Sequence, residues 1–206
     1  MYDKIFGKIP PMPEHMTVRR NTPPRLEGGL IYEDLSAIVT VRGVEYGFDF
    51  SAVTDSHKDS SRMNIILCRG EDINAEPDRF LLDLERLGEA KELKRALARG
   101  VGRTAAISEI ALGVYAISRL VDYIVISNRQ GDAKINLYAE GNDALIALLA
   151  AFSDDRIDRV RIGSFDRAAD FSDLLPKRRS YPLPIAEITD YLGDRLIIID
   201  NQDVTV

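Results

Sequence analysis

The segment from residue 44 to residue 52 most constrains what this chain can fold into. Apolar and polar or small side chains alternate there at every position, which is the period of a strand with one buried face. The apolar run 37–41 precedes it across Arg42–Gly43, and so short a connection fits only an antiparallel hairpin. The chain is therefore expected to build a sheet that includes antiparallel strands.

Further strands and a second hairpin follow from the same reasoning. Residues 63–68 read as a third strand. Residues 123–127 and 134–139 bracket a polar loop with one glycine, so they read as a second hairpin. Two short strands are expected near the C-terminus, over residues 159–162 and 195–200.

Apolar stripes at helical spacing predict the helices. Asn74 is the expected N-cap of the first helix. The apolar stripe of this helix begins at Phe80, and the helix ends at Gly100. Thr104 is the expected N-cap of the second helix. Asn142 caps a helix that is apolar on nearly every side and must be buried. The remaining expected helices and stripes cover residues 107–121, 143–152, 167–175 and 185–192.

These elements predict an α+β (mixed α/β) fold. Its sheet would be mixed but largely antiparallel, built from two hairpins with helices packed on it. Prolines 10, 11, 13, 23 and 24 hold the preceding residues out of the helical region, so residues 1–27 are expected to form an extended arm. Residues 28–206 would then form one globular domain, since 206 residues suit a single core.

Composition limits the compartment and the partners. One cysteine, Cys68, permits no disulfide within the chain, so a cytoplasmic location is expected. The longest apolar run, residues 144–152, is too short to cross a bilayer, which predicts no membrane partner. A net charge of −6 makes nucleic acid an improbable ligand. The proline-rich arm and the apolar helix instead suggest a protein partner or self-association into an oligomer.

The loop between residues 54 and 62 is the most reactive stretch by residue type. Asp55, His57 and Asp59 alternate there, and their oxygen and imidazole groups could hold a divalent cation or perform acid–base chemistry. The alternative is a solvated loop, which the same composition predicts by itself. No metal site is assigned.

Basic residues near the C-terminal third form a candidate anion surface. Arg159 and Arg161 share one face of a predicted strand. Lys177, Arg178 and Arg179 follow a predicted helix end, where cations interact favourably with the helix dipole. Helix termination and solubility explain these charges equally well without a ligand.

Motifs of covalent catalysis are missing. The serine elbow Gly-x-Ser-x-Gly does not occur, and Cys68 is expected to be a buried core thiol. The glycines at 100 and 102 follow a helix and not a strand, so a helix–helix turn is favoured over a dinucleotide site. No acyl-transfer site is supported, and no cofactor is identified.

Function is therefore constrained mainly by exclusion. The favoured hypothesis is a soluble interaction or assembly protein, such as a subunit, adaptor or inhibitor, that acts through protein–protein contacts and is not an enzyme. The alternative is a small metal-dependent hydrolase, or an enzyme that binds nucleotide or phosphate, using the 54–62 loop.

Overall fold

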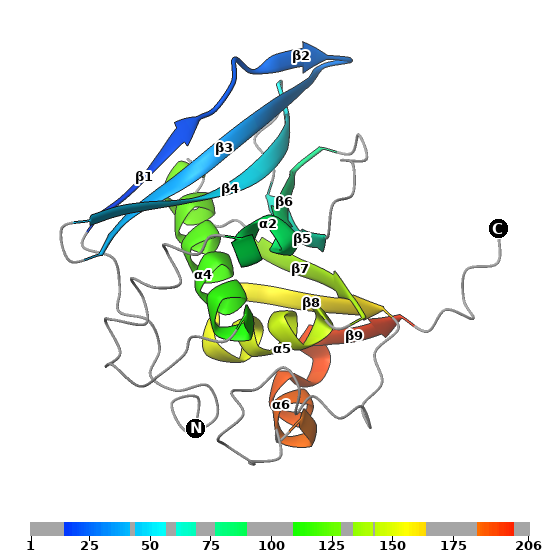
Figure 1. Cartoon of the computed structure of the whole chain (residues 1–206). Coiled ribbons are helices and arrows are strands. Elements are labelled where there is room, and N and C mark those ends of the chain that lie inside the picture. Colours follow the sequence, from blue (N-terminus) through cyan, green and yellow to red (C-terminus); the bar gives the residue numbers. More distant parts are fainter. Residues whose placement is uncertain are drawn as a thin grey trace.

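The computed structural model of the chain describes residues 15–41, 44–56, 61–68, 77–89, 109–128, 134–141, 143–163 and 185–199. Within these residues one mixed sheet is flanked by helices (Figure 1). The strands are β1 (His15–Arg20), β2 (Arg25–Glu27), β3 (Leu30–Val41), β4 (Val44–Asp55), β5 (Arg62–Cys68), β6 (Arg79–Asp83), β7 (Lys134–Glu140), β8 (Ile157–Gly163) and β9 (Leu196–Ile199). The helices are α2 (Leu84–Glu89), α4 (Glu109–Ser127), α5 (Asp143–Ser153) and α6 (Ile185–Leu192), with a short 3-10 turn, η2 (Gly193–Arg195).

The sheet has the strand order β1-β3-β4-β6-β5-β7-β8-β9, with β2 also paired to β3. Strands β1 to β4 pair antiparallel, and β4 pairs antiparallel with β6. From β6 through β9 all pairs are parallel. The predicted mixed α/β fold is confirmed, and so is the first hairpin, whose strands β3 and β4 pair from Leu30↔Asp55 to Val41↔Val44.

The second predicted hairpin is wrong. Residues 123–127 are the last turns of α4, and β7 pairs in parallel with β5 and with β8. The β-branched run was read as a strand by local propensity. Packing decides otherwise, because Ile117, Leu120, Val121 and Ile124 continue one buried helical stripe.

The first predicted helix is also wrong at its start. Phe80 lies in strand β6, where it pairs with Ile65 of β5 and with Ala52 of β4. The helix begins only at Leu84, and Asp83 caps it by accepting a hydrogen bond from the Glu85 amide at 2.9 Å. Residues 90–108, with the predicted cap Thr104 and the glycines at 100 and 102, lie outside the described part of the chain.

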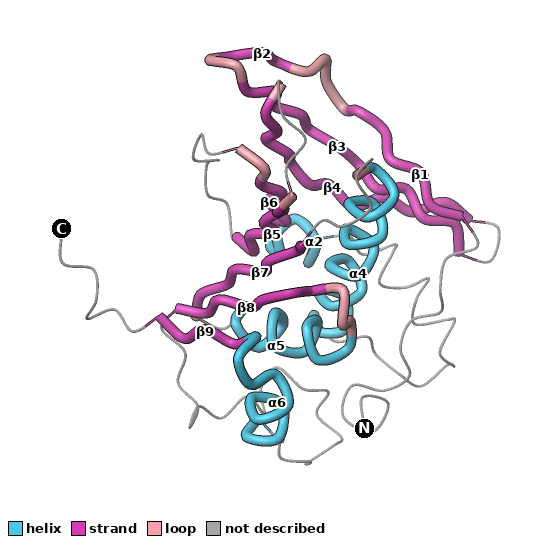
Figure 2. Tube along the Cα trace, turned by 180° about the vertical axis from the view of Figure 1, so that it is seen from behind, coloured by secondary structure: helices cyan, strands magenta, loops and turns pink. Residues whose placement is uncertain are grey.

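The helices of the described residues form one layer against one face of the sheet (Figures 1 and 2). α4 lies between α2 and α5, and α5 contacts α6. Tyr123 of α4 packs its ring 5.6 Å from Phe50 of β4 and 6.2 Å from Phe80 of β6, centroid to centroid. α5 is buried throughout residues 143–151, as its composition predicted.

α4 and α5 pack closely because of a glycine. A Cβ at Gly113 would lie 2.8 Å from Cγ2 of Ile146, so only glycine allows this approach. Residues 110–127 of α4 are also long and apolar enough to cross a bilayer, but 67% of that stretch is buried in the fold. This degree of burial is typical of a core helix.

The first and the last described strands both join the sheet. β1 and β2 pair with β3, and β9 pairs with β8 beyond the predicted helix α6. Residues 1–14 and the predicted helix 167–175 lie outside the described residues. The division into an arm at 1–27 and a domain at 28–206 stays a prediction.

Candidate functional site

The strand order reverses at β5. β6 follows β5 in sequence and pairs on one side of it, whereas β7 pairs on the other side. In open α/β sheets, ligands bind outside the carboxyl ends of the strands at such a reversal. β5 ends at Cys68 and β7 ends at Glu140. The candidate site is therefore at the carboxyl ends of these two strands, which we call the β5–β7 edge.

The turn from β7 into α5 lies at this edge. It occupies only residues 141 and 142, and Gly141 has a left-handed φ of 54°. The Gly141 amide donates to the carbonyl of Gly163 at the end of β8, at 3.3 Å. The Gly141 carbonyl accepts from the Ala144 amide of α5 at 3.2 Å. Backbone hydrogen bonds thus fix this turn between β8 and α5.

The surface above the turn is open. Gly141 is exposed, and a Cβ placed on it would have no heavy atom within 4 Å. The Glu140 side chain lies beside Gly163, where a Cβ would come within 3.4 Å of its Cγ. Asp143 is buried in the first turn of α5, where a carboxylate interacts favourably with the helix dipole. At Gly141 the chain therefore presents a bare backbone, with Glu140 before it and Asp143 shortly after it in sequence.

A charged cluster lies at the other end of α5. Arg156 donates to Asp154 at 2.6 and 2.8 Å and to Asp122 of α4 at 2.7 Å, and Arg119 pairs with Asp122 at 3.1 Å. Burial alone would raise the pKa of Asp154. The hydrogen bonds and charge of Arg156, with the charge of Arg119, nevertheless hold that pKa below its usual range. The 11 residues of α5 between this cluster and the turn span about 16 Å, so the cluster joins helices and does not belong to the site.

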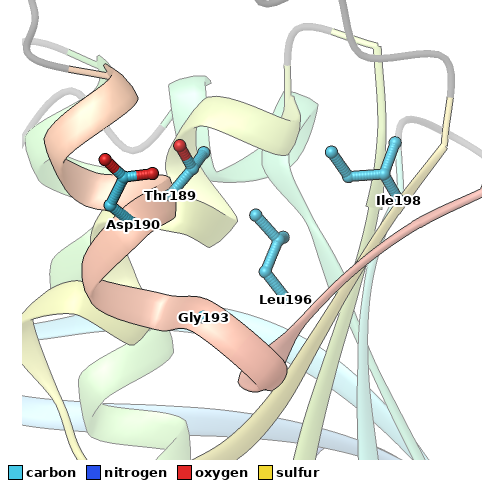
Figure 3. A pocket seen from close by; sticks show the side chains of 5 residues that line it. All are labelled: Thr189, Asp190, Gly193, Leu196 and Ile198. Atoms are coloured by element: carbon cyan, nitrogen blue, oxygen red, sulfur yellow. The ribbon is translucent and has the colours of Figure 1, made fainter.

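A pocket of about 290 Å³ lies between α6 and β9 (Figure 3). Leu196 and Ile198 form its apolar wall, and Thr189, Asp190 and Gly193 complete the lining. The Thr189 hydroxyl donates to the Ala186 carbonyl of its own helix at 3.0 Å. This pocket is at the last strand of the sheet and contributes nothing to the β5–β7 edge.

The described ends of the 54–62 segment lie at the amino ends of the parallel strands. Asp55 ends β4, which runs antiparallel to β6, and Arg62 begins β5. His57 and Asp59 lie outside the described residues. Within the described part of the chain, no three His, Cys, Asp or Glu side chains are grouped to hold a metal ion.

The predicted anion surface is described only in part. Arg159 and Arg161 are both on β8 and point to the sheet face away from the helix layer, since Val160 and Ile162 point into the core. Lys177, Arg178 and Arg179 lie outside the described residues. Cys68 is buried, as expected.

Solved esterase structures resemble this fold. A glucuronoyl esterase from Solibacter usitatus superposes with a TM-score of 0.64 at 13% identity, covering 97% of this chain and 71% of that one. A CE15 glucuronoyl esterase from Teredinibacter turnerae T7901 gives 0.61 at 13% identity, with 82% and 50% covered. A cold-adapted esterase from an Arctic intertidal metagenomic library gives 0.53 at 14% identity, with 89% and 88% covered. No family model and no curated protein sequence matches the chain.

At this identity the likeness establishes the fold, which is of the α/β-hydrolase type. The chain spans half the length of the Teredinibacter enzyme, and 44% and 43% of the glucuronoyl esterases from Sporotrichum thermophile and Hypocrea jecorina. The expectation of an interaction or assembly protein is contradicted, because the solved structures that share this fold are esterases.

Sequence reasoning missed the turn at Gly141. In α/β-hydrolases the nucleophile sits on a sharp turn between a strand and a helix, at the carboxyl edge of the sheet. The turn from β7 to α5 has this placement, and glycine occupies its left-handed position. The signal was a glycine between an alternating strand and an apolar helix. It went unrecognised because β7 was assigned to a hairpin and because the turn carries no serine.

Proposed function

We propose that this chain is a hydrolase-type domain that binds a carboxylic ester at the Gly141 turn without forming a covalent acyl intermediate there. One observation carries the proposal: a turn in the nucleophile position of the fold, open to solvent, whose central residue is glycine. The ester as ligand class is taken from the esterases that share the fold.

The position of the turn favours ligand binding. It lies at the reversal of strand order, where α/β sheets receive their ligands. Without a side chain at Gly141, the ester carbonyl has room to approach the backbone, and the backbone hydrogen bonds to Gly163 and Ala144 keep the surface in place. A solvent-exposed turn held in place by a rigid sheet is a common location for ligand contacts.

Covalent catalysis lacks its parts within the 206 residues. A glycine has no atom with which to attack a carbonyl carbon. In α/β-hydrolases the histidine base follows the nucleophile in sequence, whereas His15 and His57 both precede residue 141. His15 is on β1, five strand spacings from β7, or about 24 Å away.

Binding of the methyl ester of glucuronic acid, followed by ligand-observed NMR, tests the proposal. The informative variant is Gly141→Asn, since asparagine tolerates a left-handed φ and would fill the open space. We expect the wild type to bind the ester and release no methanol, and the variant to bind roughly tenfold more weakly.

The matched control is Gly28→Asn in the β2–β3 turn. Gly28 has a φ of 57° and the same lack of neighbours within 4 Å, but it is remote from the β5–β7 edge. This variant should bind the ester like the wild type. The proposal fails if the wild type does not bind the ester, if both variants bind equally, or if methanol is released at a rate that Gly141→Asn leaves unchanged.

A further inference from the structure

The sheet has a second face that no helix of the described residues covers. Paired residues of neighbouring strands point to the same face, so the register defines rows across it. One row runs from Asp34 through Ser51, Leu81, Ile66, Tyr138 and Arg161 to Ile197. The row beside it contains Arg79, Asn64, Asn136 and Arg159.

Over β7 and β8 this face is polar where parallel strands are normally apolar, whereas toward β4 and β6 it includes the buried Val53 and Leu81. Parallel sheets are usually covered on both faces, and their strands then read as continuous hydrophobic runs. β7 and residues 159–162 of β8 instead alternate, with core residues on the helix side and polar residues on the other. Asn136, Tyr138 and Arg161 are half-buried there and Arg159 is exposed. The fold itself does not require these polar side chains.

Within the described part of the chain, the contacts on this face leave side-chain hydrogen-bonding groups for a ligand. Asn136 donates from Nδ2 to Oδ1 of Asn64 at 3.0 Å, which leaves the Asn136 carbonyl and the Asn64 amide hydrogens directed to other partners. The Arg161 guanidinium lies 5.5 Å from the centre of the Tyr138 ring. The Arg159 Nε is 3.9 Å from Asp158, beyond hydrogen-bonding distance, with half of its side chain exposed.

We propose that this face of β5, β7 and β8 binds an oligosaccharide that carries carboxylate groups. Arg159 and Arg161 are two residues apart on one strand, about 7 Å at strand rise, and guanidinium groups are the side chains best suited to carboxylates. The side-chain amides of Asn64 and Asn136 and the Tyr138 phenol match hydroxyl groups, which both donate and accept. The proposal concerns a surface separate from the Gly141 turn and does not depend on ester binding there.

Charge on the same face limits the size of the ligand. Asp34 ends the row on the β3 side, and Glu140 lies two residues beyond Tyr138 at the carboxyl edge. Both would repel an anion that extended past β5 or past the strand ends. Because the net charge of the whole chain is −6, an anion is bound only where the positive charges of Arg159 and Arg161 exceed the negative charge around them.

Binding of oligogalacturonate to the full chain at low ionic strength, measured by calorimetry, tests the proposal. The variant is Arg159→Gln/Arg161→Gln. Its control, Arg19→Gln/Arg25→Gln, removes the same charge from exposed positions on β1 and β2, and Arg25 lies over Tyr32 at 5.4 Å much as Arg161 lies over Tyr138. We expect roughly tenfold weaker binding in the first variant and a change within about twofold in the control.

Three other ligands separate the alternatives. Neutral dextran should not bind, and polyglutamate should bind more weakly than oligogalacturonate, because it lacks the hydroxyl groups. The proposal is overturned if the wild type does not bind oligogalacturonate, if both double variants lose affinity equally, if polyglutamate binds as tightly, or if only sulfated heparin binds.

Discussion

Arg156 and Asp122 form an ion pair of 2.7 Å between residues that are 34 positions apart in sequence. Arg156 follows α5 and Asp122 is on α4, so this contact joins the two longest described helices. Asp122 also forms an ion pair with the buried Arg119, and Arg156 forms one with Asp154. Four charged side chains thus depend on one another.

Replacing Arg156 by methionine should lower the free energy of unfolding by about 1–3 kcal/mol, because Asp122 and Asp154 lose a charged donor while partly buried. Urea denaturation measures the change. The control is Arg159→Met, whose nearest described carboxylate is 3.9 Å away on an exposed surface. That variant should stay within about 0.5 kcal/mol of the wild type. Equal losses would show that the Arg156 cluster does not stabilise the fold.

The stability conferred by Asp154 should depend on pH. Its pKa is lowered in the folded state, against burial, by Arg156 and Arg119. The contribution is therefore complete above the unfolded pKa, about 3.9, and disappears as pH falls through the lower, folded pKa. The stability difference between wild type and Asp154→Asn should be constant near neutral pH and shrink below about pH 4. In an Arg156→Met background burial is opposed only by the charge of Arg119, so the pKa of Asp154 should be raised and this pH dependence should change sign.

Gly113 and Ile146 should be energetically coupled. A Cβ at residue 113 would lie 2.8 Å from Cγ2 and 3.2 Å from Cδ1 of Ile146, so Gly113→Ala forces the α4–α5 contact apart. When Ile146 is alanine, the same substitution meets no such obstacle and gains the higher helix propensity of alanine, about 1 kcal/mol. A double-mutant cycle should give a coupling of about 1–3 kcal/mol. A coupling near zero would mean that α4 and α5 separate without cost.

A serine introduced at residue 141 should not create an esterase. Gly141→Ser puts a hydroxyl at the nucleophile position of the fold and costs about 1 kcal/mol in stability, because the residue keeps a left-handed φ. Gly28→Ser, at a φ of 57°, should cost a similar amount. Hydrolysis of p-nitrophenyl acetate should stay at the level of the Gly28 variant, since none of the residues after the turn, up to residue 206, is a histidine. A clear rise in turnover would reveal a base that sequence order does not indicate.

The sequence predicted those elements whose pattern is local. The alternation at residues 44–52 predicted β4, and the all-apolar stretch at 143–152 predicted the buried helix α5, since in each case one period dominates. Residues 79–83 and 123–127 were misassigned, because short apolar runs fit a strand or a helix equally well and distant packing decides. Tyr123 is helical where its ring meets Phe50 and Phe80, and neither contact is visible in the sequence.

The candidate site escaped prediction for a related reason. Its position depends on β5 and β7 being neighbours, and their residues Asn64 and Asn136 are 72 positions apart.

On the uncovered face of the sheet, Arg159 and Arg161 were found from the sequence because both lie on one strand. That Asn64, Asn136 and Tyr138 share their face follows only from the register of three strands.

The backbone bonds at Gly141 also bear on how such a chain changes over time. The amide of Gly141 binds the carbonyl of Gly163, and its carbonyl binds the amide of Ala144, so no side chain at residue 141 takes part in shaping the turn. The path of the chain is consequently independent of whether that residue is reactive. Catalytic and non-catalytic descendants of one ancestor can therefore share this turn unchanged, and a single exchange at residue 141 removes a nucleophile while leaving the architecture around it intact.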